Sequence, residues 1–229
     1  MFHWRADILP GVSAAFTDEG AGNLALHVGD DPAAVQERRI RLEQSIGLEP
    51  QALRFMNQVH GTTVALMDAQ SPVPVADAMV SRGLPLAVMV ADCIPVLLAG
   101  ESGSGPVLAA VHAGRPGVAN GVLPAAVDSM KALGASRIRA WMGPSICGSC
   151  YEVPAALRDE VSALVPATRS TTSWGTPALD LPAGARSQLE AAGVDVEYSG
   201  VCTLETETLY SYRRDRNTGR FAGLVWRHD

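Results

Sequence analysis

Continuous apolar runs and helically spaced hydrophobic residues follow one another along this chain of 229 residues. The almost uninterrupted runs are typical of strands that are covered on both faces, and the shorter runs indicate strands at sheet margins. Strands are predicted at residues 53–58, 62–67, 84–91, 107–111, 138–142 and 194–198. The two earliest lie on either side of His60 and Gly61.

Helical spacing of the apolar residues predicts helices at residues 33–46, 118–133, 154–164 and 182–192. Pro32 suits the first turn of the first helix, and Gly134 suits the C-cap of the second. The final thirty residues predict a β-pair formed by 209–213 and 221–226, around the polar turn at 215–219.

Strands and helices mix along the chain without strict alternation. This pattern favours a layered α/β domain with a mixed β-sheet and flanking helices over a regular doubly wound fold. Neither a linker nor an internal repeat interrupts residues 1–229, so we expect a single domain.

Composition narrows the classes of partner. Hydrophobic residues make up 47% of the chain, enough for a sizeable core, and the net charge of −6 argues against a nucleic-acid-binding surface. A small anionic substrate is still possible because a pocket can be locally positive. The longest apolar stretch, 84–100, is short for a bilayer span and contains Asp92. We expect a monomer or weak homodimer without membrane contact.

The number of cysteines and the first residues of the chain indicate in which cellular compartment the protein is expected. Four cysteines in a chain of this length do not suggest a disulfide scaffold. The first residues lack the basic and then apolar pattern of a signal peptide. A reduced, cytoplasmic location is therefore expected.

Three short sequence motifs contain most of the candidate catalytic residues, and each places a metal-ligating side chain at the edge of an apolar run. They contain His60, Cys93 and His112. Two imidazoles and a thiolate from three strand ends would make a three-ligand zinc site with one open position, which is typical of catalytic zinc. Taken singly, each has a plainer interpretation: His60 as a loop histidine and Cys93 as an inert buried thiol. The trio together favours catalysis.

Other polar residues leave alternatives open. Asp92 is either a capping residue or a carboxylate that orients a ligand histidine or transfers protons. Cys147 and Cys150 have the spacing of a zinc knuckle or redox pair, but a single pair is weak evidence, and a structural loop is favoured. The basic cluster formed by Arg213, Arg214, Arg216 and Arg220 is best interpreted as a solvated hairpin, in which one or two arginines could bind a phosphate.

Eight sequence motifs occur in the same order as in the YfiH-like laccase-domain family, and the resemblance runs from about residue 10 to the carboxyl end. Members are also called multicopper polyphenol oxidases and, more recently, purine nucleoside phosphorylases. The motifs are Leu26-His27-Val28-Gly29-Asp30-Asp31-Pro32, Gln58-Val59-His60-Gly61, Ala76-Asp77-Ala78, Ala91-Asp92-Cys93-Ile94-Pro95-Val96-Leu97-Leu98, Ala110-Val111-His112-Ala113-Gly114, Cys150-Tyr151-Glu152-Val153, Cys202-Thr203 and Ser211-Tyr212-Arg213-Arg214.

The resemblance implies a zinc enzyme that phosphorolyses adenosine, inosine, guanosine and methylthioadenosine and deaminates adenosine. Its zinc ligands carry over onto His60, Cys93 and His112, which would also be catalytic together with Asp92. Candidate residues for binding nucleoside or phosphate are His27, Arg39, Arg115 and Arg213, and His27 and Asp92 are candidates for proton transfer.

Two rival functions are weighed. A copper oxidase is a poor fit because a multicopper centre consumes many imidazoles, whereas the chain has five histidines and no His-x-His pair. A metal-free cysteine hydrolase would use Cys93 with His112 or His60 as base. A metal-stabilised binding module is the non-enzyme alternative.

The chain departs from the family at one point. Where the family usually reads His-Ala-Gly-Trp-Arg-Gly, Arg115 holds the tryptophan position and Pro116 the arginine position. Pro116 has no backbone donor. We hypothesise that Arg115 faces the metal pocket and supplies the positive charge that the family's arginine provides at the position of Pro116.

Overall fold

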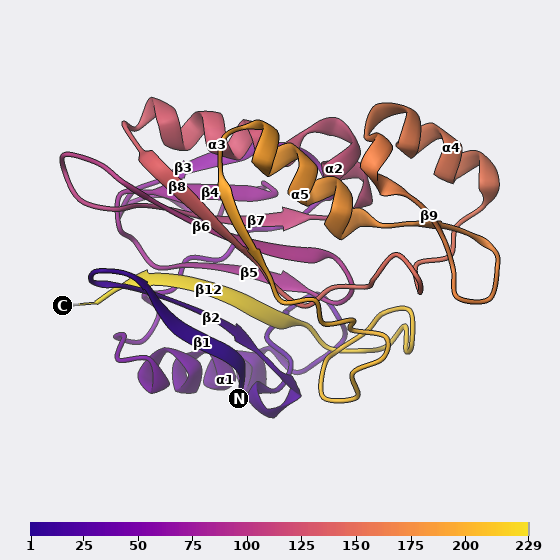
Figure 1. The fold of residues 1–229 in the computed structure, drawn as a ribbon. Helices are drawn as coiled ribbons and strands as arrows, with labels where there is room; N and C mark the ends of the chain where they lie inside the picture. Colours follow the sequence, from indigo (N-terminus) through magenta and orange to yellow (C-terminus); the bar gives the residue numbers. More distant parts are fainter. Residues whose placement is uncertain (229) are drawn as a thin grey trace.

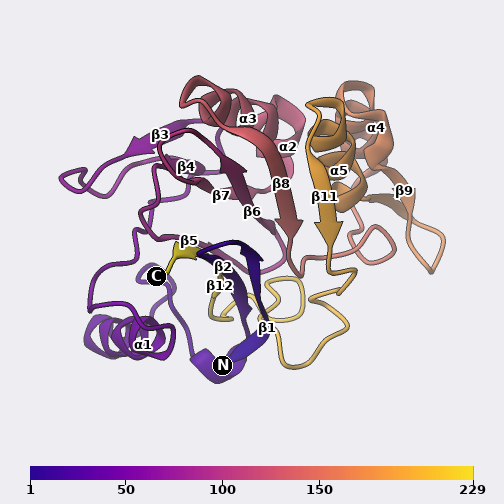
Figure 2. The same cartoon turned by 60° about the vertical axis from the view of Figure 1, so that its left-hand side comes forward.

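Four layers make up the molecule in a computed structural model that describes residues 1–228. A group of helices covers one face of a six-stranded sheet, whose other face packs on a four-stranded sheet, and α1 covers the far side (Figure 1). Figure 2 shows α1 on the side of the four-stranded sheet away from the other helices. The mixed α/β class predicted from sequence is confirmed, with two main sheets instead of one.

The helices and strands have the following bounds. The α-helices are α1 (Pro32–Ser45), α2 (Arg115–Asn120), α3 (Val122–Ala132), α4 (Ala155–Leu164) and α5 (Leu181–Ala191). The strands are β1 (Phe2–Leu9), β2 (Val12–Thr17), β3 (Val64–Met67), β4 (Ala78–Ser81), β5 (Leu86–Val90), β6 (Ile94–Glu101), β7 (Val107–Ala113), β8 (Ser136–Met142), β9 (Arg169–Thr171), β10 (Pro177–Leu179), β11 (Asp195–Tyr198) and β12 (Phe221–Arg227). Short 3-10 helices lie at η1 (Glu19–Ala21) and η2 (Pro166–Thr168).

Strand order explains the long apolar runs. The six-stranded sheet has the order β11-β8-β6-β7-β4-β3, with parallel pairs at both margins and antiparallel pairs between them. The four-stranded sheet, β1-β2-β12-β5, is antiparallel. In β6, Val96 and Leu98 face the helices, while Leu97 and Ala99 face the other sheet. Both faces of this strand are buried, so apolar residues occupy every position.

Three elements predicted from the sequence differ in the structure: one helix is divided, and two segments are not strands. The helix at 118–133 is divided into α2 and α3 by Gly121, which adopts a left-handed conformation with φ of 85°. Residues 53–58 form isolated bridges at Arg54 and Asn57 instead of a strand. Residues 209–213 form turns held by local bonds, such as Asp215 N–H to the Ser211 carbonyl, and β12 pairs with β2 and β5 instead.

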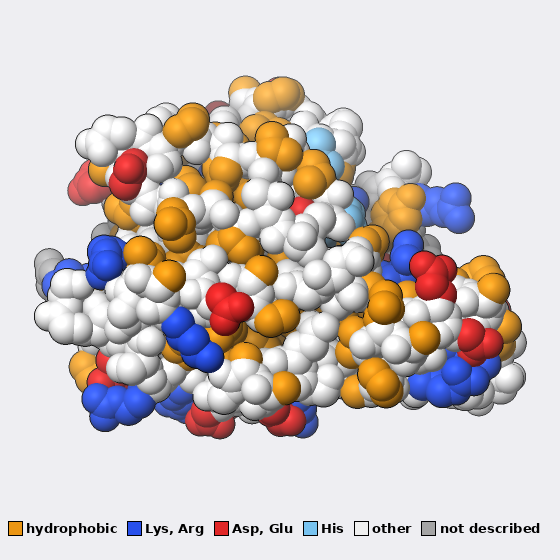
Figure 3. Space-filling model, turned by 90° about the horizontal axis from the view of Figure 1, so that it is seen from above, with side chains coloured by type: hydrophobic (Ala, Val, Ile, Leu, Met, Phe, Trp, Pro, Cys, Tyr) orange, Lys and Arg blue, Asp and Glu red, His pale blue; other side chains and the backbone are white. Residues whose placement is uncertain are grey.

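The surface of the molecule has two further features. Among the described residues, no helix is long and apolar enough to cross a membrane. Seen from above, Lys and Arg side chains lie in separate groups with Asp and Glu among them (Figure 3).

Candidate metal centre

His60, Cys93 and His112 converge at one point of the structure. Their ligand atoms all lie within 4.8 Å of one another, and Cys93 Sγ is 3.8 Å from His60 Nε2. The imidazole rings of His60 and His112 meet edge to face, with centroids 4.6 Å apart. His112 is buried, Cys93 is half-buried and His60 is exposed, so the group opens to solvent on one side. Two imidazoles and a thiol at these separations fit a single zinc-sized ion.

The three side chains reach this point from different local structures. His112 lies on β7, and Cys93 lies in the turn between β5 and β6. His60 lies in a loop and has φ of 61°, a left-handed conformation that a histidine rarely adopts. The expectation of three strand ends therefore holds for Cys93 and His112 but is wrong for His60.

Asp77 holds the centre together and was not singled out from the sequence. Its side chain is fully buried and accepts a hydrogen bond from His112 Nδ1 at 2.8 Å. It also accepts from the backbone N–H groups of His60, at 2.9 Å, and Gly61, at 2.6 Å. Burial opposes the charged carboxylate, but these hydrogen bonds and the charge of His112 keep the pKa of Asp77 below its ordinary value.

This contact with Asp77 determines which nitrogen of His112 is available. Because Nδ1 is bonded to the carboxylate, Nε2 is the atom left for a metal. A signal was present in the sequence, since Asp77 interrupts a short apolar segment directly before β4, and a buried carboxylate needs partners.

The thiol and imidazole of the centre alter each other's protonation. Burial alone would raise the pKa of Cys93, but His112 and His60 lower it to about 6. Burial disfavours the charged form of His112, yet the Cys93 thiolate and Asp77 raise its pKa above the ordinary value. The site therefore favours the thiolate, which is the form that binds metals.

Gly114 leaves room for the ligands. A Cβ at this position would lie 2.8 Å from His60 Cδ2 and 3.2 Å from Cys93 Sγ. The φ of Gly114 is −76°, which any residue adopts, so space and not backbone conformation requires glycine here.

Three arginines, Arg115, Arg213 and Arg220, lie near the centre. Arg213 lies over the Tyr151 ring with its guanidinium 5.2 Å from the centroid and donates twice to the Glu152 carbonyl, each at 3.1 Å. Arg115 interacts with the same tyrosine. Burial raises the pKa of Tyr151, while the charge of Arg115 lowers it and that of Cys93 raises it. Burial lowers the pKa of Arg220, and the negative charges of Cys93 and Asp92 oppose this shift. Because charge interactions weaken with distance, the influence of Cys93 places Arg220 and Tyr151 near the thiolate, and Arg115 and Arg213 lie beside Tyr151.

Arg115 is half-buried and opens α2 beside Gly114. The hypothesis that it faces the pocket is consistent with its contact to Tyr151. The helix itself has only six residues, and Pro116 in its first turn has no N–H to donate to an anion.

Asp92 has a structural role in these contacts. It occupies a left-handed turn with φ of 82°, and its carboxylate accepts from Thr203 Oγ1 and from the backbone N–H of Arg213, each at 2.6 Å. The histidine-orienting carboxylate considered from the sequence is Asp77 instead. Asp92 fixes the segment that carries Arg213.

His27 and Arg39 lie close enough to influence each other's charge. The pKa of His27 is lowered by partial burial and by the positive charges of Arg220 and Arg39. Arg39 donates twice to the Leu24 carbonyl, at 2.9 and 2.7 Å, and lies 3.8 Å from the Phe55 ring centroid. Its guanidinium is thus engaged by the protein.

Comparison with known proteins gives this arrangement a family. Residues 5–228 match the family described as multi-copper polyphenol oxidoreductase laccase. The chain belongs to this family. The family resemblance predicted from the eight sequence motifs is thereby confirmed.

Relatives within the laccase family are similar over nearly the whole chain. Purine nucleoside phosphorylase SCO2081 of Streptomyces coelicolor is 52% identical, covering 97% of this chain and 98% of the relative. Purine nucleoside phosphorylase Rv2149c of Mycobacterium tuberculosis is 48% identical, covering 89% of this chain and 84% of the relative.

Solved structures of family members share the fold. Protein NMB0706 of Neisseria meningitidis superposes with a TM-score of 0.85 at 34% identity, covering 99% of each chain. YlmD of Geobacillus stearothermophilus gives a TM-score of 0.86 at 29% identity, covering 98% of this chain and 94% of that one. The names of the curated relatives support an enzyme.

Proposed function

We propose that this chain is a zinc-dependent purine nucleoside phosphorylase. It converts adenosine, inosine, guanosine and methylthioadenosine to the free base and the pentose 1-phosphate, and it deaminates adenosine at the same centre. The observation that carries the proposal is a three-ligand group, open on one side, next to three arginines. The names of relatives about half identical over nearly the full chain support the reaction.

The donor set fits zinc, with His60, Cys93 and His112 as its ligands. A zinc ion held there would supply Lewis-acid chemistry toward a substrate atom or a water. Asp77 orients His112 and increases the basicity of its ring, as outer carboxylates do for metal-bound histidines. Gly114 leaves space for the side chains of His60 and Cys93, and Gly61 leaves space for the Asp77 carboxylate.

Phosphorolysis needs an anion held beside the pentose. An oxygen of inorganic phosphate forms a bond to C1′, the C1′–N bond of the nucleoside breaks, and the purine departs with the electron pair and takes up a proton. Arg115, Arg213 and Arg220 provide the positive charge that would attract the phosphate. The guanidinium groups of Arg213 and Arg220 also donate to backbone carbonyls. Tyr151, stacked under Arg213, offers an aromatic wall.

A second candidate is a metal-free cysteine hydrolase, and one observation favours it. Cys93, His112 and Asp77 form a thiol–imidazole–carboxylate series, and the pKa of the thiol is lowered to about 6. A thiolate bound to zinc is not available as a free nucleophile, so metal content separates the two functions. The copper oxidase remains the weaker rival because the chain has five histidines in all.

The deciding experiment combines metal analysis with a nucleoside panel. Purified protein is assayed on adenosine, inosine, guanosine and methylthioadenosine, with and without phosphate, before and after chelation. We expect zinc to co-purify with the protein and the release of free base to require phosphate. Chelation should abolish both the release of base and the release of ammonia from adenosine.

Cys93→Ala supplies the matching variant. It should lose turnover of adenosine and inosine and the zinc ion held by His60, Cys93 and His112 while it stays folded, because the thiol lies at the mouth of the site. His3→Ala, which removes a histidine outside the ligand trio, is the control. Full turnover by Cys93→Ala would show the zinc-catalyst proposal to be wrong, and chelator-resistant hydrolysis that needs Cys93 would favour the hydrolase.

A further inference from the structure

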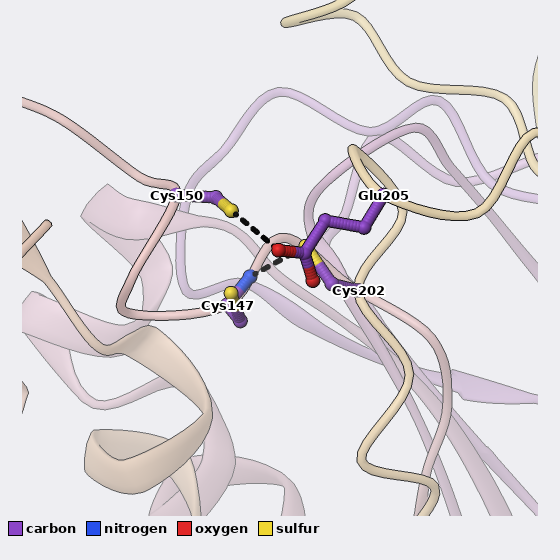
Figure 4. Close-up of side chains that lie close together, drawn as sticks. All are labelled: Cys147, Cys150, Cys202 and Glu205. Carbon is purple, nitrogen blue, oxygen red and sulfur yellow. Dashed lines mark hydrogen bonds between the residues drawn. The ribbon is translucent and has the colours of Figure 1, made fainter. Parts of the chain in front are cut away.

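A second group of metal-ligating side chains lies in the loops that follow β8 and β11. It consists of Cys147, Cys150, Cys202 and Glu205, whose ligand atoms all lie within 4.8 Å of one another. Figure 4 shows the sulfur of Cys150 pointing toward the Glu205 carboxylate and Cys147 lying beside Cys202. This group contains every cysteine of the chain except Cys93.

The backbone of the first loop brings two thiols to one side. The N–H groups of Cys150 and Tyr151 both donate to the Cys147 carbonyl, at 3.1 and 3.0 Å. This tight turn places the two sulfurs of the Cys-x-x-Cys pair together, as in zinc knuckles.

A bridge between the two loops adds the third thiol. Ser145 N–H donates to the Val201 carbonyl at 3.2 Å, and Thr203 N–H donates to the Ser145 carbonyl at 3.1 Å. Cys202 lies inside this bridge, and its sulfur accepts from the backbone N–H of Cys147 at 3.5 Å. An N–H that donates to sulfur stabilises the negative charge that a bound metal requires.

The fourth ligand comes from the solvent side. Glu205 is exposed, and its carboxylate reaches the Cys150 thiol at 3.5 Å. Cys150 and Cys202 are buried, with Ile146 and Leu204 packed around them in a small apolar cluster. Three thiols and a carboxylate thus make a complete set of four, whereas the first centre has three ligands and an open side.

We propose that Cys147, Cys150, Cys202 and Glu205 bind a second metal ion, a structural zinc. Four ligands without an open position are the usual arrangement of structural zinc sites, and three sulfurs select a thiophilic ion over magnesium or calcium. A disulfide between two of the cysteines would leave the third thiol and the inward-turned carboxylate without a function.

The second ion would stabilise one wall of the first centre. The Ile146 N–H donates to the Asp92 carbonyl at 3.0 Å, and Thr203 Oγ1 donates to the Asp92 carboxylate at 2.6 Å. Both loops of the thiol cluster are therefore bonded to the residue that precedes Cys93. Tyr151, which faces the arginines of the open side, follows Cys150 directly. The ion acts on catalysis only by positioning these groups.

A cobalt titration tests the second site independently of nucleoside turnover. In Cys93→Ser, every remaining thiol belongs to the cluster, since the chain has four cysteines. We expect metal-free Cys93→Ser loaded with Co²⁺ to show strong thiolate-to-cobalt charge-transfer absorption and to retain one zinc ion per chain when loaded with Zn²⁺. Wild type should bind one more ion than this variant.

Matched variants assign the ligands. In the Cys93→Ser background, Cys147→Ser and Cys202→Ser should lose the absorption band, and Glu205→Gln should weaken zinc binding by about tenfold or more. Ser149→Ala in the same turn and Glu207→Gln in the same loop should change neither measurement. Glu205→Gln keeps all three thiols and so tests the site even if a cysteine variant fails to fold.

Two results would overturn the proposal. One is a Cys93→Ser protein that takes up neither Co²⁺ nor Zn²⁺ under conditions that load the wild type at one site. The other is a disulfide among the three cysteines in freshly purified protein, found by peptide mass mapping. Neither result would bear on zinc at His60, Cys93 and His112, so the two proposals fail separately.

Discussion

The buried carboxylate of Asp77 accepts a hydrogen bond from His112 Nδ1 at 2.8 Å and so turns the opposite nitrogen of this imidazole toward Cys93. A metal-binding histidine is commonly oriented by such a carboxylate. The same carboxylate accepts from the backbone of the His60 loop. One buried side chain thus positions both histidines.

Asp77→Asn tests this arrangement. The amide retains the shape but loses the charge and one acceptor oxygen, so the loop at His60 and the tautomer of His112 are no longer fixed. We expect about a 10–100-fold loss of zinc affinity or of nucleoside turnover. Zinc affinity is measured by competition with a chromophoric chelator. Asp195→Asn, at an exposed carboxylate on β11, is the control. Unaltered affinity in Asp77→Asn would contradict the orienting role.

Gly114→Ala tests whether space at the centre is limiting. The new methyl would lie 2.8 Å from His60 Cδ2, so the imidazole or the turn must move. We expect a cost of about 1–3 kcal/mol in stability or metal binding, with the fold retained because φ is permissive. Zinc content and the urea midpoint measure the two effects. Gly103→Ala, where a Cβ meets nothing within 4 Å, should have no effect on zinc, and a fully metallated Gly114→Ala would refute the packing argument.

Sequence patterns could predict the elements that are buried on both faces. The runs that became β5 and β7 are continuous because sheets or helices cover each side, and this pattern survives in a single sequence. Cys93 and His112 were found for the same reason, since they lie at or beyond the ends of these runs.

Features that depend on contacts distant in sequence could not be predicted. Asp77 acts through a loop that precedes it, and the third thiol of the second cluster, Cys202, follows a different strand. The split between α2 and α3 depends on the left-handed conformation of Gly121, which apolar spacing does not reveal. Residues 209–213 read as a strand, but local turns satisfy their backbone instead.

Arg115→Ala tests the compensation for Pro116. Arg115 contacts Tyr151 beside the thiolate, and a charge-assisted hydrogen bond to phosphate is worth about 1.5–3 kcal/mol. We expect KM for phosphate in phosphorolysis to rise by roughly tenfold or more with a smaller change in KM for inosine. Arg216→Ala removes an exposed arginine of the same carboxyl-terminal cluster as Arg213 and should leave both constants unchanged. An unchanged phosphate KM in Arg115→Ala would make Arg115 a structural residue.

The last prediction concerns the pH at which each thiol of the metal-free protein reacts. Burial raises the pKa of Cys93, but His112 and His60 outweigh burial and bring it to about 6. Burial and neighbouring thiols instead raise the pKa of Cys147 and Cys150. Because the thiolate is the nucleophile, alkylation of Cys93 should increase through about pH 6 and be complete at neutrality, when the other two barely react.

Iodoacetamide labelling with peptide mass mapping, after chelation, measures these rates from pH 5 to 9. Zinc added back should protect Cys93, since its lone pair is then engaged by the metal. His112→Gln removes the main positive neighbour, so its midpoint for Cys93 should move up toward the ordinary thiol value. A common midpoint for all cysteines near that ordinary value would contradict the charge pairing of Cys93 with His112, because a thiol without a cationic neighbour has no reason to ionise early.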